Sequence, residues 1–138
     1  MPNTTSDRYL ETQILSADPI QLVNMLYRGA LEAVLAARGY LAAGLIMERS
    51  GRIMKAWDIL NELSCSLDHG PAPELSARLA ALYAHMQQRL MDANLQQADA
   101  PLAEVEALLC TLSEAWQAVQ AWAPPAREPD YQPMSCAL

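Results

Sequence analysis

The residue types that most often perform chemistry are sparse in this sequence and poorly placed to act together. Two histidines occur, His69 in a Gly/Pro-rich segment and His85 in an amphipathic pattern. Neither has a second His, Cys or carboxylate at ligand spacing on its own helical face. Cys110 has no adjacent base that would activate a thiol nucleophile, and no Gly-rich phosphate-binding loop is present. We therefore expect no enzyme activity, no bound metal and no cofactor.

The acidic residues and the cysteines also give no indication of a catalytic or metal site. Glu104 and Glu106 do not share a helical face, so they are predicted to be solvated charges. The cysteines are odd in number and far apart in sequence, which indicates reduced thiols in a cytoplasmic protein. Two of them, Cys65 and Cys110, fall in helical patterns, and we expect both in the core because free cysteine is usually buried. The polar first ten residues lack the apolar region of a signal peptide.

The charge balance narrows the classes of partner. The chain has 138 residues, with 16 acidic against 9 basic side chains and a net charge of -7. Nucleic acids and anionic membrane surfaces both reward clustered Lys and Arg, so neither is expected as a ligand. No apolar run reaches the roughly 18 residues that a membrane span needs. A protein partner remains the expectation.

The hydrophobic pattern predicts an all-α fold. Apolar residues recur at three- and four-residue steps over about 19–43, 50–69, 73–97 and 101–122, and nothing alternates as strands do. Short connections favour an antiparallel four-helix bundle over residues 18–122, with an N-terminal arm at 1–17 and a disordered Pro-rich tail at 123–138. The apolar stripes include Met54, Leu75 and Val119. A helical repeat protein is the lesser alternative, since the segments share no motif.

The arm carries more apolar residues than a simple connection needs. Tyr9, Leu10 and Ile14 precede the first helix, and Leu10 and Ile14 are one helical turn apart. The arm could therefore fold as a short helix and dock on the bundle. The alternative is a hydrophobic staple, in which one residue before the cap packs on the first turn, but a staple accounts for one apolar residue only.

The first helix has a wide apolar face. Leu22, Met25, Leu26 and Tyr27 lie on it together with further Val, Leu and Ala residues, and they cover more than the single stripe that a bundle helix requires. The surplus can face the arm or form a groove for a partner's amphipathic helix. It can equally belong to a deeply buried helix, and the sequence alone does not separate these alternatives.

Several strings resemble the flagellin-specific export chaperones, the FliS family. The strings are YLETQILSADP at 9–19, LVNMLYRGA at 22–30, KAWDILNEL at 55–63, SLD at 66–68 and LYAHMQQRLMDAN at 82–94. They keep the family's order and spacing, and the fourth helix carries Trp116 near its end, as the family's does. Arg28 departs from the pattern, since the family usually has an acidic residue or Asn there, and His85 replaces a Tyr.

The resemblance implies a cytoplasmic chaperone that binds the disordered C-terminal segment of flagellin, blocks premature polymerisation and keeps the subunit ready for type III flagellar secretion. It implies that Tyr9, Leu10 and Ile14 cap an apolar groove, with Leu22, Met25, Leu26 and Tyr27 in the groove wall or the core beneath it. Docking on the flagellar export gate is implied by the family alone. We expect a monomer or a weak homodimer.

Two other functions stay open at this point. A generic helical adaptor, or a bundle that uses its apolar surplus to form a homodimer with no groove left free, would show the same helical pattern. A metal-binding or catalytic bundle would require bound metal, which we do not expect.

Overall fold

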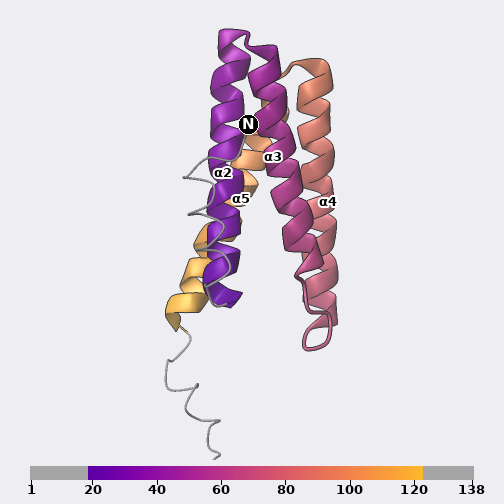
Figure 1. Cartoon of the computed structure of the whole chain (residues 1–138). Helices are drawn as coiled ribbons and strands as arrows, with labels where there is room; N and C mark the ends of the chain where they lie inside the picture. The colour runs from indigo at the N-terminus through magenta and orange to yellow at the C-terminus, as the bar shows by residue number, and fades with distance from the viewer. Residues whose placement is uncertain (1–18, 123–138) are drawn as a thin grey trace, which may run out of the picture.

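The computed structural model describes residues 19–122, which form four α-helices. The helices are α2 (Pro19–Ala43), α3 (Ile46–Cys65), α4 (Pro73–Gln96) and α5 (Ala100–Trp122). Short connections make successive helices antiparallel, as Figure 1 shows. The described part of the chain contains no strand, so the predicted all-α four-helix bundle is confirmed. The predicted arm at 1–17 and tail at 123–138 lie outside the described residues.

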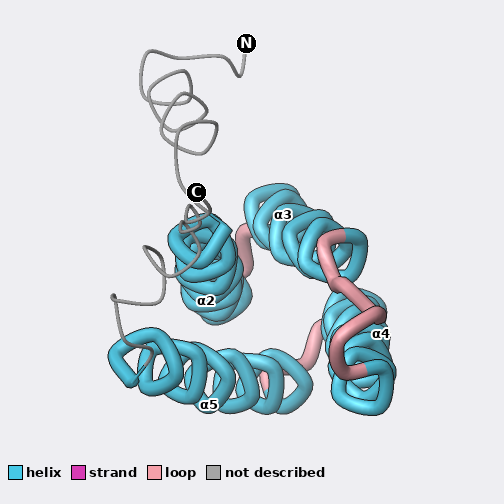
Figure 2. The backbone as a smooth tube through the Cα atoms, turned by 90° about the horizontal axis from the view of Figure 1, so that it is seen from below, coloured by secondary structure: helices cyan, strands magenta, loops and turns pink. Residues whose placement is uncertain are grey.

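The four helices form a ring in which each packs on the next and α5 closes against α2. Figure 2, seen along the bundle, shows α2, α3 and α4 nearly end-on, while α5 is inclined and extends along one side of the ring from α2 toward α4. Small residues on α2 allow close packing. A Cβ added at Gly29 would lie 3.3 Å from Cδ1 of Ile59 on α3, so the end of the Ile59 side chain would have to shift by a few tenths of an ångström.

The core lies inside this ring and is almost entirely aliphatic. Two tyrosines and one methionine supplement the alanine, leucine, isoleucine and valine side chains. Its buried members are Leu26, Tyr27, Ala30, Ala33, Val34, Ala37, Ile53, Ala56, Leu60, Leu63, Tyr83, Met86, Leu90, Ala93, Leu102, Val105 and Leu109.

The helix ends follow from local residue chemistry. Gly44 ends α2 in the left-handed conformation at φ 75°, which glycine adopts without a Cβ penalty. Pro73 begins α4 at a position where its missing N–H is not needed. The serine of the first α4 turn, Ser76, donates from Oγ to the carbonyl of Asp68 at 3.0 Å and so fixes the preceding turn.

The second helix begins earlier than predicted. α3 starts at Ile46 rather than near Ser50, because the turn after α2 takes only Gly44 and Leu45. The apolar run 45–47 is therefore helical or adjacent to the helix, yet its three side chains are exposed. The start of α3 is joined to the end of α4 through Asn94, whose Oδ1 accepts from Nε of the buried Arg49 at 3.1 Å and from Oγ of Ser50 at 3.0 Å.

Several side chains lie outside the core where the pattern predicted them inside. Met54, Leu75 and Val119 are exposed. Met54 lies to one side of the buried stripe of α3, Leu75 lies in the first turn of α4 and Val119 lies in the last turn of α5. Cys65 is also exposed, at the last residue of α3 where the helix leaves the bundle, while Cys110 is half-buried. The prediction of a buried Cys65 was wrong.

Candidate functional site

A shallow, open depression lies on the surface of α3 and reaches the neighbouring α2. Its volume is about 510 Å³. All but one of its lining residues come from α3, at the three- and four-residue spacing of one helix face. The lining residues are Leu26, Gly51, Met54, Lys55, Asp58, Ile59 and Glu62.

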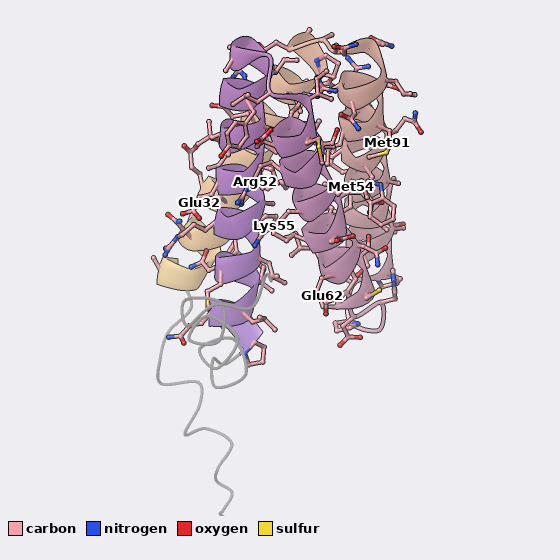
Figure 3. The ribbon with its side chains drawn as sticks, turned by 45° about the horizontal axis from the view of Figure 1, so that its top comes forward. Glu32, Arg52, Met54, Lys55, Glu62 and Met91 are labelled. Atoms are coloured by element: carbon pink, nitrogen blue, oxygen red, sulfur yellow. The ribbon has the colours of Figure 1, made fainter. Side chains whose placement is uncertain are left out.

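The depression is lined by both apolar and charged side chains: Gly51, Lys55, Asp58 and Glu62 lie along the middle of the α3 face, and Met54 and Ile59 lie at its two edges. Leu26 is buried below it and Ile59 is half-buried, whereas Met54 is 42% exposed. Figure 3 shows Met54, Lys55 and Glu62 following one another along α3. Methionine adapts its shape to varied partners. An exposed methionine therefore suits a surface that binds another apolar segment.

The predicted site residues of α2 fall into two groups. Leu22 and Met25 are half-buried, and Leu22 packs against the core from outside. Leu26 belongs to the core and also lines the depression, and Tyr27 is buried in the core. The structure thus brings Leu26 to the depression and does not bring Leu22, Met25 or Tyr27 to its lining.

The arm residues predicted to cap the groove, Tyr9, Leu10 and Ile14, lie outside the described residues.

Tyr27 forms a hydrogen bond across the centre of the bundle. Its Oη lies 2.6 Å from Oη of Tyr83 on α4, and one hydroxyl donates to the other. Burial raises the pKa of the Tyr27 hydroxyl, with a smaller opposing effect of the hydrogen bond from Tyr83. Burial, followed by the hydrogen bond to Tyr27, also raises the pKa of Tyr83. Both phenols therefore stay neutral at physiological pH.

Sequence reasoning missed most of the residues that line the depression. On α3 we predicted only the buried apolar stripe, and we placed Met54 in that stripe. The sequence does contain a second set of positions that recur at three- and four-residue steps on the opposite side of the same helix. These positions are Gly51, Lys55, Asp58 and Glu62. When a single helix is considered alone, a face that mixes glycine with charged residues is interpreted as solvent-exposed.

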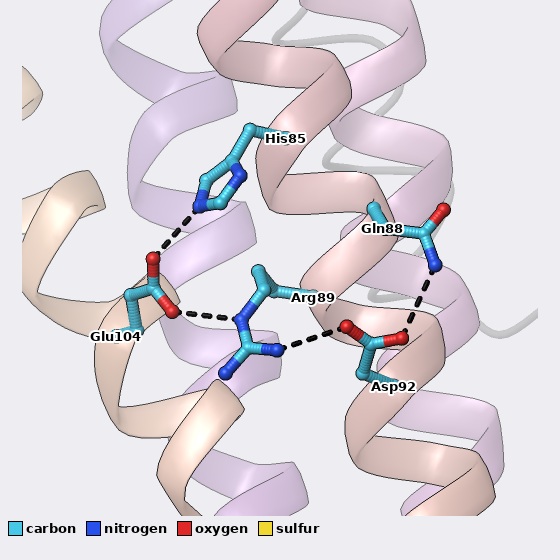
Figure 4. Close-up of polar contacts among 5 residues, drawn as sticks. All are labelled: His85, Gln88, Arg89, Asp92 and Glu104. Atoms are coloured by element: carbon cyan, nitrogen blue, oxygen red, sulfur yellow. Dashed lines mark hydrogen bonds and ion pairs between the residues drawn. The ribbon is translucent and has the colours of Figure 1, made fainter.

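A polar cluster links α4 to α5 (Figure 4). Oε1 of Glu104 accepts from Nε of Arg89 at 2.7 Å, and its Oε2 lies 2.7 Å from Nε2 of His85. Arg89 also pairs with Asp92 at 2.9 Å. The hydrogen bonds to His85 and then to Arg89 lower the pKa of the Glu104 carboxyl.

A second cluster links the end of α2 to the start of α5. Arg38 donates from Nε and Nη2 to the two carboxylate oxygens of Asp99 at 2.8 and 2.7 Å, and from Nη1 to Glu106. The hydrogen bond from Arg38 lowers the pKa of Asp99. The prediction that Glu104 and Glu106 are merely solvated was wrong, because their different faces meet different helices, α4 and α2.

Neither cluster has the composition of a catalytic or metal site. Each is a set of ion pairs that fixes α5 in the ring. Among residues 19–122, no group of three or more His, Cys, Asp or Glu side chains is arranged to hold a metal ion. Within the same residues, no helix combines the length and the apolar character needed to cross a membrane.

Comparison with known proteins places the chain in a family. The family model described as flagellar protein FliS matches residues 1–123. The chain is 36% identical over 111 residues to the flagellar secretion chaperone FliS of Salmonella typhimurium (strain LT2), covering 80% of this chain and 82% of that protein. It is 33% identical over 113 residues to the flagellar secretion chaperone FliS of Bacillus subtilis (strain 168), covering 81% and 84%.

A match of this length extends over all four helices and the segment that precedes them. The similarity to proteins of both Salmonella and Bacillus covers most of each relative as well as most of this chain. The chain belongs to the FliS family of flagellar proteins.

Proposed function

We propose that this protein is a non-enzymatic flagellar secretion chaperone that binds the C-terminal segment of flagellin in the cytoplasm. The observation that carries the proposal is the match of the family model to residues 1–123, together with relatives named flagellar secretion chaperones. Covering a flagellin end before export would stop subunits from polymerising too early. The function requires stoichiometric binding and no turnover.

The depression on α2 and α3 supports a helical mode of binding. Leu26, Met54 and Ile59 contribute apolar side chains to it, and Lys55, Asp58 and Glu62 contribute charges between Met54 and Ile59. An amphipathic helix recognises such a surface by laying its apolar face on the apolar side chains and keeping its polar face in water. A disordered flagellin segment would fold as it binds, so that apolar burial supplies the affinity and ordering of the segment offsets part of it.

We propose that the N-terminal arm competes with flagellin for the apolar surface formed by α2 and α3. Tyr9, Leu10 and Ile14 supply the apolar side chains of the arm. Leu22 and Met25, half-buried on the first two turns of α2 and outside the lining of the depression, are the further α2 residues that we propose for the groove wall. Leu26 lines the depression, and Tyr27 is buried in the core, where it is hydrogen-bonded to Tyr83. Closure by the arm lowers the apparent affinity for flagellin by the fraction of molecules that are closed.

Titration calorimetry against a peptide of the C-terminal flagellin segment from the same bacterium tests the function. We expect one-to-one binding with a large negative heat-capacity change, which is the signature of apolar burial coupled to folding. The control is the same peptide with its apolar residues replaced by serine. Absence of binding at micromolar concentrations would contradict the proposal and favour an adaptor with a different protein partner.

A further inference from the structure

The facing surfaces of α4 and α5 are joined at one end of the bundle and open at the other. Among the side chains that the structure describes, the polar contacts between these two helices all involve Glu104, in the first turns of α5. Toward its other end α5 contacts α2 instead, where Nε1 of Trp116 donates to the carbonyl oxygen of Ile20 at 3.3 Å. Because α5 is inclined, its last turns lie beside α2 and away from the start of α4 (Figures 1 and 2).

On α4, apolar side chains continue the face that meets α5. Leu82 and Leu75 lie about two and about four turns before Arg89, the partner of Glu104, and therefore share its face. Leu82 is half-buried, whereas Leu75, nearer the start of the helix, is 58% exposed. The face thus loses its cover toward the start of α4.

On α5 the cover is lost toward the end of the helix. Leu108 and Leu112 follow Glu104 at four-residue steps, and Val119 lies about two turns beyond Leu112. Leu108 and Leu112 are half-buried against the core, whereas Val119 is 54% exposed. The two faces form an open apolar surface, which we call the α4–α5 seam. Its members are Leu75, Leu82, Leu108, Leu112 and Val119.

The chain leaves the bundle at the open end of this seam. α5 ends at Trp122, in the same turn as Val119, and residues 123–138 follow outside the described part of the chain. The match to the family model ends at residue 123. Features shared by the family therefore do not account for the segment that follows.

The composition of this segment changes halfway along it. Its first part, 123–130 (APPAREPD), holds three of its four prolines and all of its charged side chains. Its second part, 131–138 (YQPMSCAL), carries no charged side chain and contains Tyr131, Met134 and Leu138. A proline-rich spacer of eight residues reaches about 25 Å when extended, and the seam from Leu108 to Val119 is about 16 Å long. The spacer is therefore long enough to return the apolar second part to the seam.

The charges of the spacer also match the seam. Arg78 lies between Leu75 and Leu82 on the same side of α4, is exposed, and forms no ion pair within residues 19–122. The spacer ends with Asp130, directly before Tyr131. A second part that lies on the seam brings this carboxylate toward the unpaired guanidinium.

We propose that residues 131–138 cover the α4–α5 seam of their own chain, with Tyr131, Met134 and Leu138 against its apolar side chains. The segment then shields the open part of the core from water and from other proteins. The seam is a different face from the depression on α2 and α3, so this docking is independent of the proposed client.

A nitroxide on the native Cys136 of the full-length chain tests the docking. Cys65→Ser and Cys110→Ala leave Cys136 as the only thiol, and the broadening of amide signals is measured by NMR. A segment that is merely tethered broadens signals near Trp122, so the α4 signals are decisive. We expect the signals of Leu75 and Leu82 to broaden strongly.

The matched control is the same labelled chain with Tyr131, Met134 and Leu138 replaced by serine. The broadening at Leu75 and Leu82 should fall severalfold in this chain, while the signals near Trp122 stay broadened. Equal broadening at Leu75 and Leu82 in the two chains would overturn the inference.

A mixed sample distinguishes the chain's own segment from that of a second copy. It combines labelled chains without isotope and isotope-enriched chains without label. We expect no broadening at Leu75 and Leu82 in this mixture. Broadening as strong as in the singly labelled chain would assign the seam to a second copy and overturn the inference.

A pair of variants on α4 tests the seam itself. Leu75 and Leu95 are both exposed on this helix, at its start and at its end. In the labelled chain, Leu75→Ser should reduce the broadening at Leu82, whereas Leu95→Ser should leave it unchanged. Equal effects of the two variants would overturn the seam as the docking site.

Discussion

The phenolic oxygens of Tyr27 and Tyr83 lie 2.6 Å apart and join α2 to α4 across the centre of the ring. These helices occupy diagonal positions, whereas the main packing contacts connect neighbouring helices around the ring. The rings of the two tyrosines are also close, with centroids 6.5 Å apart and an angle of 54° between their planes. The pair therefore fixes the distance between two helices that otherwise share few contacts.

Replacing one tyrosine should destabilise the bundle. Tyr27→Phe leaves the Tyr83 hydroxyl buried without its partner, which should cost about 1–3 kcal/mol of unfolding free energy. Urea denaturation measures the loss. Tyr40→Phe is the matched control, because Tyr40 is half-buried on the same helix and forms no hydrogen bond through its hydroxyl within the described residues. The double variant Tyr27→Phe/Tyr83→Phe should lose less than the sum of the single losses. Additive losses would show that the bond contributes nothing.

The ion pairs of Arg38 should contribute less to the free energy of unfolding than the tyrosine pair does, and their contribution should depend on salt concentration. It binds both oxygens of Asp99 and also Glu106, so Arg38→Met removes the ion pairs between α2 and α5. The groups are partly exposed, and we expect a loss of roughly 1 kcal/mol at low salt that shrinks as salt is added. Arg28→Met, at an exposed site of the same helix, should change stability little. A loss independent of salt would contradict an ionic origin.

The dependence of stability on pH should reveal the contribution of two carboxylates, Asp99 just before α5 and Glu104 in its first turns. Hydrogen bonds from Arg38, and from His85 and Arg89, hold the pKa values of Asp99 and Glu104 below their ordinary values in the folded protein. Their stabilisation is therefore complete above the ordinary carboxyl pKa of about 4 and is lost as the pH falls through the lowered folded values. Thermal midpoints between pH 7 and pH 2.5 measure the effect.

The matched variant for this test is Glu104→Gln, which removes one of the two titrating groups. Its thermal midpoint should fall less steeply between pH 5 and pH 2.5 than that of the unaltered protein. Identical slopes would show that Glu104 does not contribute to the acid sensitivity.

Met25 offers a test of the proposed groove wall on α2. Met25→Glu places a charge where an apolar client segment would pack, and we expect flagellin affinity to fall by about tenfold, or roughly 1.4 kcal/mol. Met91→Glu is the control, since Met91 is also half-buried but lies on α4. Calorimetry measures both affinities. If the two variants lose equal affinity, the wall on α2 has no special role.

Deleting the arm should raise affinity. Removal of residues 1–15 takes away Tyr9, Leu10 and Ile14, and so removes the competition that we propose for the apolar surface. The gain equals the reciprocal of the open fraction, so a protein closed nine-tenths of the time would gain about tenfold. Calorimetry with the same flagellin peptide measures the change, and an unchanged affinity would contradict gating by the arm.

The number and order of the helices could be predicted from the sequence, because their signals are local. Gly44 ends α2 and Pro73 begins α4 where the breaker residues predict. The start of α3 was less clear, since the apolar run 45–47 has no capping residue and its position depends on how tightly the chain turns. Such a turn is decided by packing rather than by propensity.

The surface features could not be predicted because they depend on which helices face each other. Glu104 and Glu106 differ only by two positions along α5, yet one meets His85 and Arg89 on α4 and the other meets Arg38 on α2. Likewise, the position of Met54 at the edge of the α3 stripe decides its exposure only after the neighbouring helices are in place.

We propose that this protein binds flagellin and thereby keeps the subunit from polymerising. Seeded elongation of purified flagellin, followed by light scattering in the presence of increasing amounts of the full-length chain, tests it most directly. We expect elongation to stop near one chaperone per flagellin, and we expect Met25→Glu to require a larger excess. Elongation at an undiminished rate in the presence of an equimolar or greater amount of the protein would contradict the claim.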